Sequence, residues 1–199
     1  LFAKRTHEII PIQGCAIQDI KSIQIAKYVM DAINEFGLSV YDEKTGQGLM
    51  RHVVVKAAKS TGEYMVILVI NAKELPHAKK IAEALRGACH SIVSVIVNVN
   101  MKKTNVILGD KNIVILGRDY ITDRLGDYFF KISPLSFYQV NPVQAEALYN
   151  YAIEEAEITK NDIVFDLYCG IGTISIFMAT SAKEVYGVEI VEQAIEMAK

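Results

Sequence analysis

The segment that most constrains the fold is Val164-Phe-Asp-Leu-Tyr-Cys-Gly-Ile-Gly-Thr173. It has the pattern of an apolar strand that ends on Asp166, a loop with two glycines, and the start of a helix. A second short strand, residues 184–188, is followed by another acid, Glu189. Ligands of parallel α/β sheets bind at the carboxyl ends of the strands. Two such strands, each ending in a carboxylate, therefore predict a nucleoside-binding site around the glycine loop.

The order of the glycines distinguishes two nucleoside cofactors. The dinucleotide-binding fingerprint is Gly-x-Gly-x-x-Gly/Ala, but Gly170 and Gly172 are followed by Ser175 at the third position. Glu189 can accept hydrogen bonds from both ribose hydroxyls, and a ligand without a pyrophosphate needs no third glycine. We expect both glycines to leave room for a ligand near the backbone. The pattern favours S-adenosylmethionine, with an NAD-dependent oxidoreductase as the alternative.

Hydrophobic periodicity divides the chain into two regions. Residues 1–132 predict an α+β central domain with a mostly antiparallel sheet, and residues 133–199 predict the beginning of a parallel α/β domain. In the first region we expect helices over residues 19–37 and 74–87, strands over 38–41, 51–58, 63–71 and 92–99, and hairpins over 105–116 and 120–132.

A helix is predicted at the start of the second region. Asn141 suits the N-cap position and Pro142 the first helical position. The periodicity places Val143, Leu148 and Tyr151 on the inner face of this helix. A strand, the glycine loop, a second helix, a second strand and a third helix follow, so the predicted fold class of the second region is α/β.

The charge balance argues against a strongly basic nucleic-acid-binding domain, because 21 basic and 23 acidic residues give a net charge of −2. No apolar run approaches the roughly 20 residues that cross a bilayer. The longest run, Tyr64–Ile70, suits a buried strand. A non-enzymatic RNA-contacting module remains as an alternative of another class, with Lys102, Lys103 and the loop near Arg51 as its surface.

A family resemblance rests on two motifs, Ser136-Phe-Tyr-Gln-Val-Asn-Pro142 and Asp166-Leu-Tyr-Cys-Gly-Ile-Gly-Thr173. Together they resemble the RumA/TrmA-type RNA (uracil-C5)-methyltransferases. His7–Gln18 and Met50–Val55 are similar to the family's central domain, and more to its bacterial 23S rRNA branch than to its tRNA branch. The resemblance implies a class I (Rossmann-like) methyltransferase domain in residues 133–199, S-adenosylmethionine as cofactor, RNA as partner and 5-methyluridine as product.

The resemblance also implies which residues bind the cofactor. Glu189 would hold the ribose, Tyr168 would pack on the cofactor, and Gln139 would contact it from the segment before the domain. Gly170 and Gly172 would shape the loop. Two of these residues also have a purely structural interpretation: Tyr168 as a half-buried aromatic and Gln139 as a brace for the following helix.

The family's reaction needs two catalytic groups. A cysteine thiolate adds to C6 of uracil, and a carboxylate base removes the C5 proton. In the family this cysteine lies in a later Ser-Cys-Asn-Pro-like segment, which residues 1–199 lack. Cys169 lies instead in the cofactor loop. We therefore expect no catalytic residue in this chain and no methyl transfer by these residues alone.

The chain has three widely spaced cysteines, Cys15, Cys89 and Cys169, and no CxxC pair. This spacing argues against a disulfide framework and against a zinc site. It favours a reducing, cytoplasmic setting. In cluster-bearing relatives a cysteine at the position of Cys15 is the fourth ligand of a 4Fe–4S cluster, and one thiol alone cannot hold a cluster.

The chain starts at Leu1 and stops at Lys199 inside a predicted helix. We therefore expect a fragment that either forms a dimer through its unpaired sheet edge or leaves residues near 160–199 poorly ordered.

Overall fold

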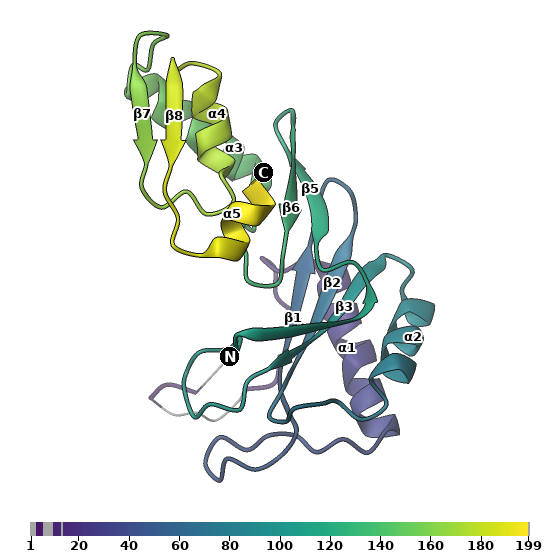
Figure 1. The fold of residues 1–199 in the computed structure, drawn as a ribbon. Helices are drawn as coiled ribbons and strands as arrows, with labels where there is room; N and C mark the ends of the chain where they lie inside the picture. Colours follow the sequence, from purple (N-terminus) through teal and green to yellow (C-terminus); the bar gives the residue numbers. More distant parts are fainter. Residues whose placement is uncertain (1–2, 6–9, 13, 199) are drawn as a thin grey trace.

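The computed structural model describes residues 3–5, 10–12 and 14–198 (Figure 1). His7, Glu8 and Ile9, from the predicted extended segment, and Lys199 lie outside the described residues. The first region is a four-stranded sheet in the order β1-β2-β3-β4, with both of its helices against one face. Its elements are α1 (Ile20–Glu35), β1 (Met50–Ala57), β2 (Tyr64–Ile70), α2 (Ala78–Ala88), β3 (Ile92–Val99) and β4 (Lys111–Gly117).

The sheet is mixed rather than purely antiparallel. β1 and β4 are antiparallel to their neighbours, but β3 runs parallel to β2 because α2 connects the two strands. Every residue of β2 is buried, as the apolar run Tyr64–Ile70 predicted. Leu68 faces the core beneath α1 and α2, and Ile67 faces a second core on the opposite side of the sheet.

The predicted hairpin over residues 105–116 is wrong. β4 pairs with β3, and residues 100–110 form an irregular connection. The buried Asn98 side chain accepts a hydrogen bond from the Gly109 amide (2.7 Å) and donates one to its carbonyl (2.8 Å). Asn100 donates to two further carbonyls of the connection. These side chains take the place of the backbone ladder that a hairpin would have supplied.

Two further predicted boundaries need correction. The strand predicted over residues 38–41 reduces to a single bridge with β1. The second helix begins at Ala78 rather than at Glu74 because Pro76 disfavours helical backbone at the preceding residue. It also continues through Gly87, the predicted end, and finishes one residue later.

The first region ends with a hairpin, and the second region begins with a helix and continues as a βαβ unit (Figure 1). β5 and β6 form the predicted antiparallel hairpin, and β7 and β8 are parallel neighbours with α4 between them in the chain. The elements are β5 (Ile121–Leu125), β6 (Tyr128–Ile132), α3 (Pro142–Glu155), β7 (Ile163–Asp166), α4 (Thr173–Ala179), β8 (Glu184–Gly187) and α5 (Glu192–Ala198). The predicted order of strand, loop, helix and strand is thereby confirmed.

Helix α3 starts as predicted but buries a different face. Asn141 is its N-cap, and its side chain accepts a hydrogen bond from the Gln144 amide. The predicted inner residues are exposed: Val143, Leu148 and Tyr151. The helix instead packs against α4 and β5 through Ala145 and Tyr149, and the Tyr149 ring meets the Phe177 ring edge-on at 5.6 Å. Small and aromatic side chains, not the aliphatic ones, mark the contact face.

The second core joins the two regions. It contains Met65 and Ile67 of the central sheet, Ile121 of the β5–β6 hairpin, and Ile171 and Phe177 of the βαβ unit. The domain boundary between residues 132 and 133 stays a prediction, because this core extends across it. Among the described residues, no helix is both long and apolar enough to cross a membrane.

Candidate cofactor site

The loop between β7 and α4 depends on glycine for its conformation. Gly170 and Gly172 have φ angles of 55° and 77°, in the left-handed region that other residues rarely adopt. No atom of the described residues would lie within 4 Å of a Cβ at position 170, so backbone conformation, and not crowding, requires this glycine. The loop is closed by hydrogen bonds from the Cys169 amide to the Val188 carbonyl (3.1 Å) and from the Gly172 amide to the Cys169 carbonyl (2.8 Å).

The two acids at the strand ends have different partners. Asp166 accepts a hydrogen bond of 2.6 Å from the Ser175 hydroxyl of α4. Glu189 accepts one from the Gly170 amide at Oε2 (3.0 Å) and one from the Val191 amide at Oε1 (2.9 Å). The Val191 amide and, to a smaller extent, the Gly170 amide hold the pKa of the Glu189 carboxyl below its ordinary value. Glu189 is therefore an ionised group bound directly to the glycine loop.

The remaining predicted site residues are less closely joined. The Tyr168 side chain is 92% exposed and extends from the loop into solvent. Gln139 is half-buried and lies in the segment before α3. Within the described residues, no hydrogen bond connects Gln139 to the glycine loop. The structure thus brings together Gly170, Gly172 and Glu189, leaves Tyr168 free beside them, and holds Gln139 on a separate segment.

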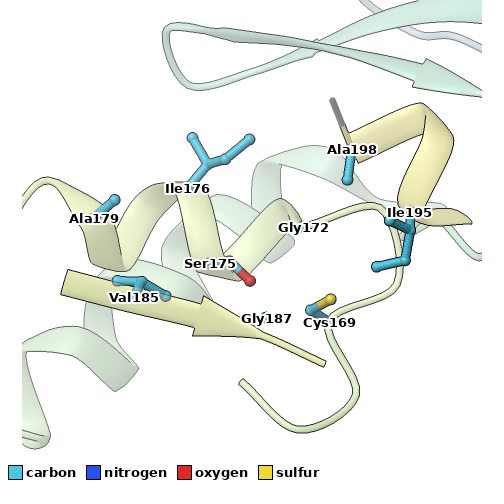
Figure 2. A pocket seen from close by; sticks show the side chains of 9 residues that line it. All are labelled: Cys169, Gly172, Ser175, Ile176, Ala179, Val185, Gly187, Ile195 and Ala198. Atoms are coloured by element: carbon cyan, nitrogen blue, oxygen red, sulfur yellow. The ribbon is translucent and has the colours of Figure 1, made fainter. Parts of the chain in front are cut away.

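A cavity of about 290 Å³ lies between α4, β8 and α5, on the inner side of the loop (Figure 2). Its lining is mostly aliphatic, and of the predicted cofactor residues only Gly172 contributes to it. Ser175 contributes a hydroxyl, which is already bonded to Asp166. A ribose needs polar partners, so the side of the loop that carries Glu189 and Tyr168 fits a nucleoside better than this cavity does.

Cys169 lies at the edge of this cavity in the environment of a structural thiol. Its sulfur packs so closely on Gly187 that a Cβ there would lie 2.9 Å from it (Figure 2). Burial raises the pKa of the Cys169 thiol, and the Asp166 and Glu189 carboxylates raise it further. A catalytic cysteine needs the opposite shift, toward the thiolate, so this environment fits the prediction that Cys169 is not the nucleophile.

Two residues of this region were missed in the sequence. The hydroxyl of Ser175 fixes the Asp166 carboxylate, although the serine was interpreted only as the absence of a third glycine. Gly187 makes room for the Cys169 sulfur, and its place at the end of an apolar strand was the available signal.

The RNA-contacting surface suggested for Lys102, Lys103 and the loop near Arg51 stays a prediction, and the Arg51 side chain supports this region from within. The Arg51 side chain is 1% exposed and donates hydrogen bonds to the carbonyls of Asn100 and Lys102, both at 2.9 Å. It is therefore a buried support of the loops, and the exposed lysines Lys102 and Lys103 are the cations that could meet RNA. Among the described residues, no three His, Cys, Asp or Glu side chains cluster as metal ligands would.

Comparison with known proteins begins with a family match over most of the chain. A sequence model of the tRNA (Uracil-5-)-methyltransferase family matches residues 21–199. An RNA methyltransferase of Clostridium tetani is 48% identical over 198 residues, which cover 100% of this chain and 43% of that protein. One from Caldanaerobacter subterraneus is also 48% identical, with 44% of its length covered.

A solved structure shows the same similarity. The Pyrococcus abyssi tRNA (uracil-54, C5)-methyltransferase in complex with S-adenosyl-L-homocysteine is 28% identical, with a TM-score of 0.80 over 99% of this chain and 46% of that one. The fold is that of an α/β methyltransferase domain. The chain belongs to the tRNA (uracil-5-)-methyltransferase family. It spans less than half the length of the curated relatives it matches. The predicted resemblance and fold class are confirmed.

Proposed function

We propose that this chain is part of a longer methyltransferase that binds S-adenosylmethionine and forms 5-methyluridine in RNA. The observation that carries the proposal is the pair of hydrogen bonds that hold the ionised Glu189 against the glycine loop. Each Glu189 oxygen accepts one backbone N–H and keeps a further lone pair for a ribose hydroxyl. The NAD-dependent alternative loses its support, because the third glycine position is Ser175 and the family transfers methyl groups.

The residues of this chain bind and orient the cofactor in this proposal. Glu189 accepts hydrogen bonds from the ribose, the exposed Tyr168 ring packs on the cofactor, and Gln139 approaches from the segment before α3. Gly170 and Gly172 give the loop its left-handed turns. When bound, S-adenosylmethionine supplies an electrophilic methyl group to C5 of uracil.

We assign the nucleophilic cysteine and the proton-accepting carboxylate to parts of the protein outside residues 1–199. Cys169, which burial keeps protonated, supports this assignment. We place Cys15 as the fourth ligand of a 4Fe–4S cluster in the full-length protein, where other segments would supply three cysteines. Cys15, Cys89 and Cys169 are free thiols here, which suits the cytoplasm as the proposed location.

The proposed substrate is 23S rRNA. Its support is the similarity of Met50–Val55 and the segment around Cys15 to the rRNA-modifying branch of the family. A tRNA substrate is the second candidate, favoured by the description of the matching family and by the tRNA specificity of the Pyrococcus abyssi enzyme.

Methylation of purified RNA tests both substrates. Full-length protein with S-adenosylmethionine is expected to produce 5-methyluridine in unmodified 23S rRNA, measured by mass spectrometry of RNA digests. Unmodified tRNA should yield none, and residues 1–199 alone should yield none from either RNA. Product in tRNA only would transfer the assignment to tRNA. Product from residues 1–199 alone would refute the assignment of the nucleophile to another part of the protein.

We also propose that residues 1–199 self-associate through the open β7–β8 sheet. Phe165 and Tyr186 stack at 5.3 Å between ring centroids and are 63% and 48% exposed. In sedimentation velocity we expect a concentration-dependent dimer that Phe165→Ser shifts to monomer. Phe129→Ser, at an exposed aromatic on β6, is the matched control and should leave the dimer intact. A monomer at all concentrations would contradict this proposal.

A further inference from the structure

A half-buried lysine, Lys56, connects the central sheet to the segment that carries Gln139. Lys56 lies on the same face of β1 as Val54, which packs against the second core, and Ala58 of that core directly follows the strand. Its ammonium group donates hydrogen bonds to the carbonyl of Ser133 at 2.9 Å and to the carbonyl of Ser136 at 2.7 Å. Burial lowers the pKa of Lys56 to about 8. Removing an ammonium group from water costs free energy, and the two hydrogen bonds to carbonyls offset this cost.

The two carbonyls belong to a turn that is closed by hydrogen bonds between its own serines. Ser133 and Ser136 are buried, and their hydroxyls lie 2.8 Å apart. The Ser136 hydroxyl accepts a hydrogen bond from the Ser133 amide, and the Ser133 hydroxyl accepts one from the Ser136 amide. Because these bonds join the two ends of the turn, the two contacts from Lys56 hold it as one unit against β1.

Gln139 lies a short distance along the chain from two fixed points. Ser136 precedes it by three residues, and the α3 N-cap Asn141 follows it by two. Between them the Tyr138 ring packs on the Phe130 ring, with centroids 6.3 Å apart. The position of the Gln139 backbone is therefore set by the turn on one side and by helix α3 on the other.

We propose that Lys56 is a positioning residue for cofactor binding, which acts by holding the 133–136 turn so that Gln139 reaches the cofactor. The inference rests on the proposed function, because it requires Gln139 to contact S-adenosylmethionine. In the part of the chain that the structure describes, Lys56 makes no hydrogen bond to the glycine loop, and its side-chain bonds go to the 133–136 turn. Its role is to connect the sheet of the first region to a binding residue of the second.

Cofactor affinity in single and double variants tests this role. Titration calorimetry of full-length protein with S-adenosylhomocysteine should show about tenfold weaker binding for Lys56→Met, from the loss of two charge-assisted hydrogen bonds. Gln139→Ala should weaken binding to a similar extent. In the double variant the two effects should not multiply, because both remove the same contact. Lys56→Arg, which can still donate to two carbonyls, should restore most of the affinity.

The controls separate positioning from general damage to the fold. Lys59→Met removes an exposed lysine on the connection after β1 and should leave the affinity unchanged. If Lys56→Met does not fold, Lys56→Gln retains one donor group and should fall between wild type and Gln139→Ala. Multiplied effects in the double variant, or wild-type affinity of Lys56→Met beside a weakened Gln139→Ala, would overturn the inference. Wild-type affinity of both Gln139→Ala and Glu189→Ala would instead refute the proposed cofactor site.

Discussion

Replacing Glu189 with alanine is expected to weaken binding of S-adenosylhomocysteine at least about 50-fold, because charge-assisted hydrogen bonds to ribose hydroxyls are lost. The substitution also removes the acceptor of the Gly170 amide, so the loop loses a contact that joins it to the end of β8. The affinity of Glu189→Gln should lie between those of wild type and Glu189→Ala. The glutamine amide keeps one acceptor oxygen, but its NH2 group faces a backbone N–H that needs an acceptor. Titration calorimetry on full-length protein measures all three.

The matched control is Glu184→Ala at the start of β8. That carboxylate accepts a hydrogen bond of 2.6 Å from Tyr186, away from the glycine loop, and its loss changes the net charge equally. Its affinity for S-adenosylhomocysteine should stay at the wild-type value. NAD should not bind to any variant. Wild-type affinity of Glu189→Ala, or binding of NAD in place of S-adenosylhomocysteine, would refute the assignment of the ribose to Glu189.

The pH dependence of this binding follows from the same contacts. The lowered pKa of Glu189 means that its carboxylate forms below the ordinary value of 4.5. Glu189 should therefore stay ionised throughout the neutral range, and its protonation should weaken cofactor binding only in more acidic solution.

Local sequence patterns were sufficient where one short segment determines its own structure. Tyr64–Ile70 can satisfy its apolar side chains only in a strand covered on both faces, and Asn141 with Pro142 starts a helix whatever surrounds it. Asp166 and Glu189 were predicted to meet at one sheet edge because parallel strands end together. The direct bond from Gly170 to Glu189 depends on the left-handed backbone of the loop, which the sequence indicates only through its glycine.

The remaining features depend on partners that are distant in the sequence. Asn98 holds the connection to β4 through side-chain bonds that hydrophobic periodicity does not register. The buried face of α3 is set by Phe177 on α4, so the spacing within the helix could not identify it. The sequence around Lys56 does not distinguish it from other lysines near a strand end, because its partner Ser133 is distant in the sequence.

Replacing Arg51 with methionine is expected to lower the free energy of unfolding by about 3 kcal/mol, because the buried guanidinium donates two charge-assisted hydrogen bonds that are lost. The guanidinium joins three parts of the first region. It donates to the Asn100 and Lys102 carbonyls, lies 4.5 Å from the centroid of the Tyr41 ring, and pairs with Glu43 at 3.7 Å. Methionine fills much of the space but leaves these carbonyls without their donor.

A matched comparison distinguishes burial from distance as the source of this effect. The Lys102–Asp110 pair is shorter, at 2.7 Å, but its side chains are 73% and 87% exposed. Water screens such a pair, so Lys102→Met should change the free energy of unfolding by less than about 0.5 kcal/mol. Urea denaturation followed by circular dichroism measures both variants. Equal losses would mean that burial does not determine the strength of the Arg51 contacts.

The same two variants separate loop order from direct RNA contact. If Lys102 binds phosphate, Lys102→Met should weaken RNA binding and reduce its salt dependence while stability is retained. Arg51→Met should weaken RNA binding through loss of the loop that carries Lys102, and this loss should accompany a lower free energy of unfolding. Weaker RNA binding in Arg51→Met with an unchanged free energy of unfolding would mean that Arg51 reaches RNA itself, in contradiction to its 1% exposure.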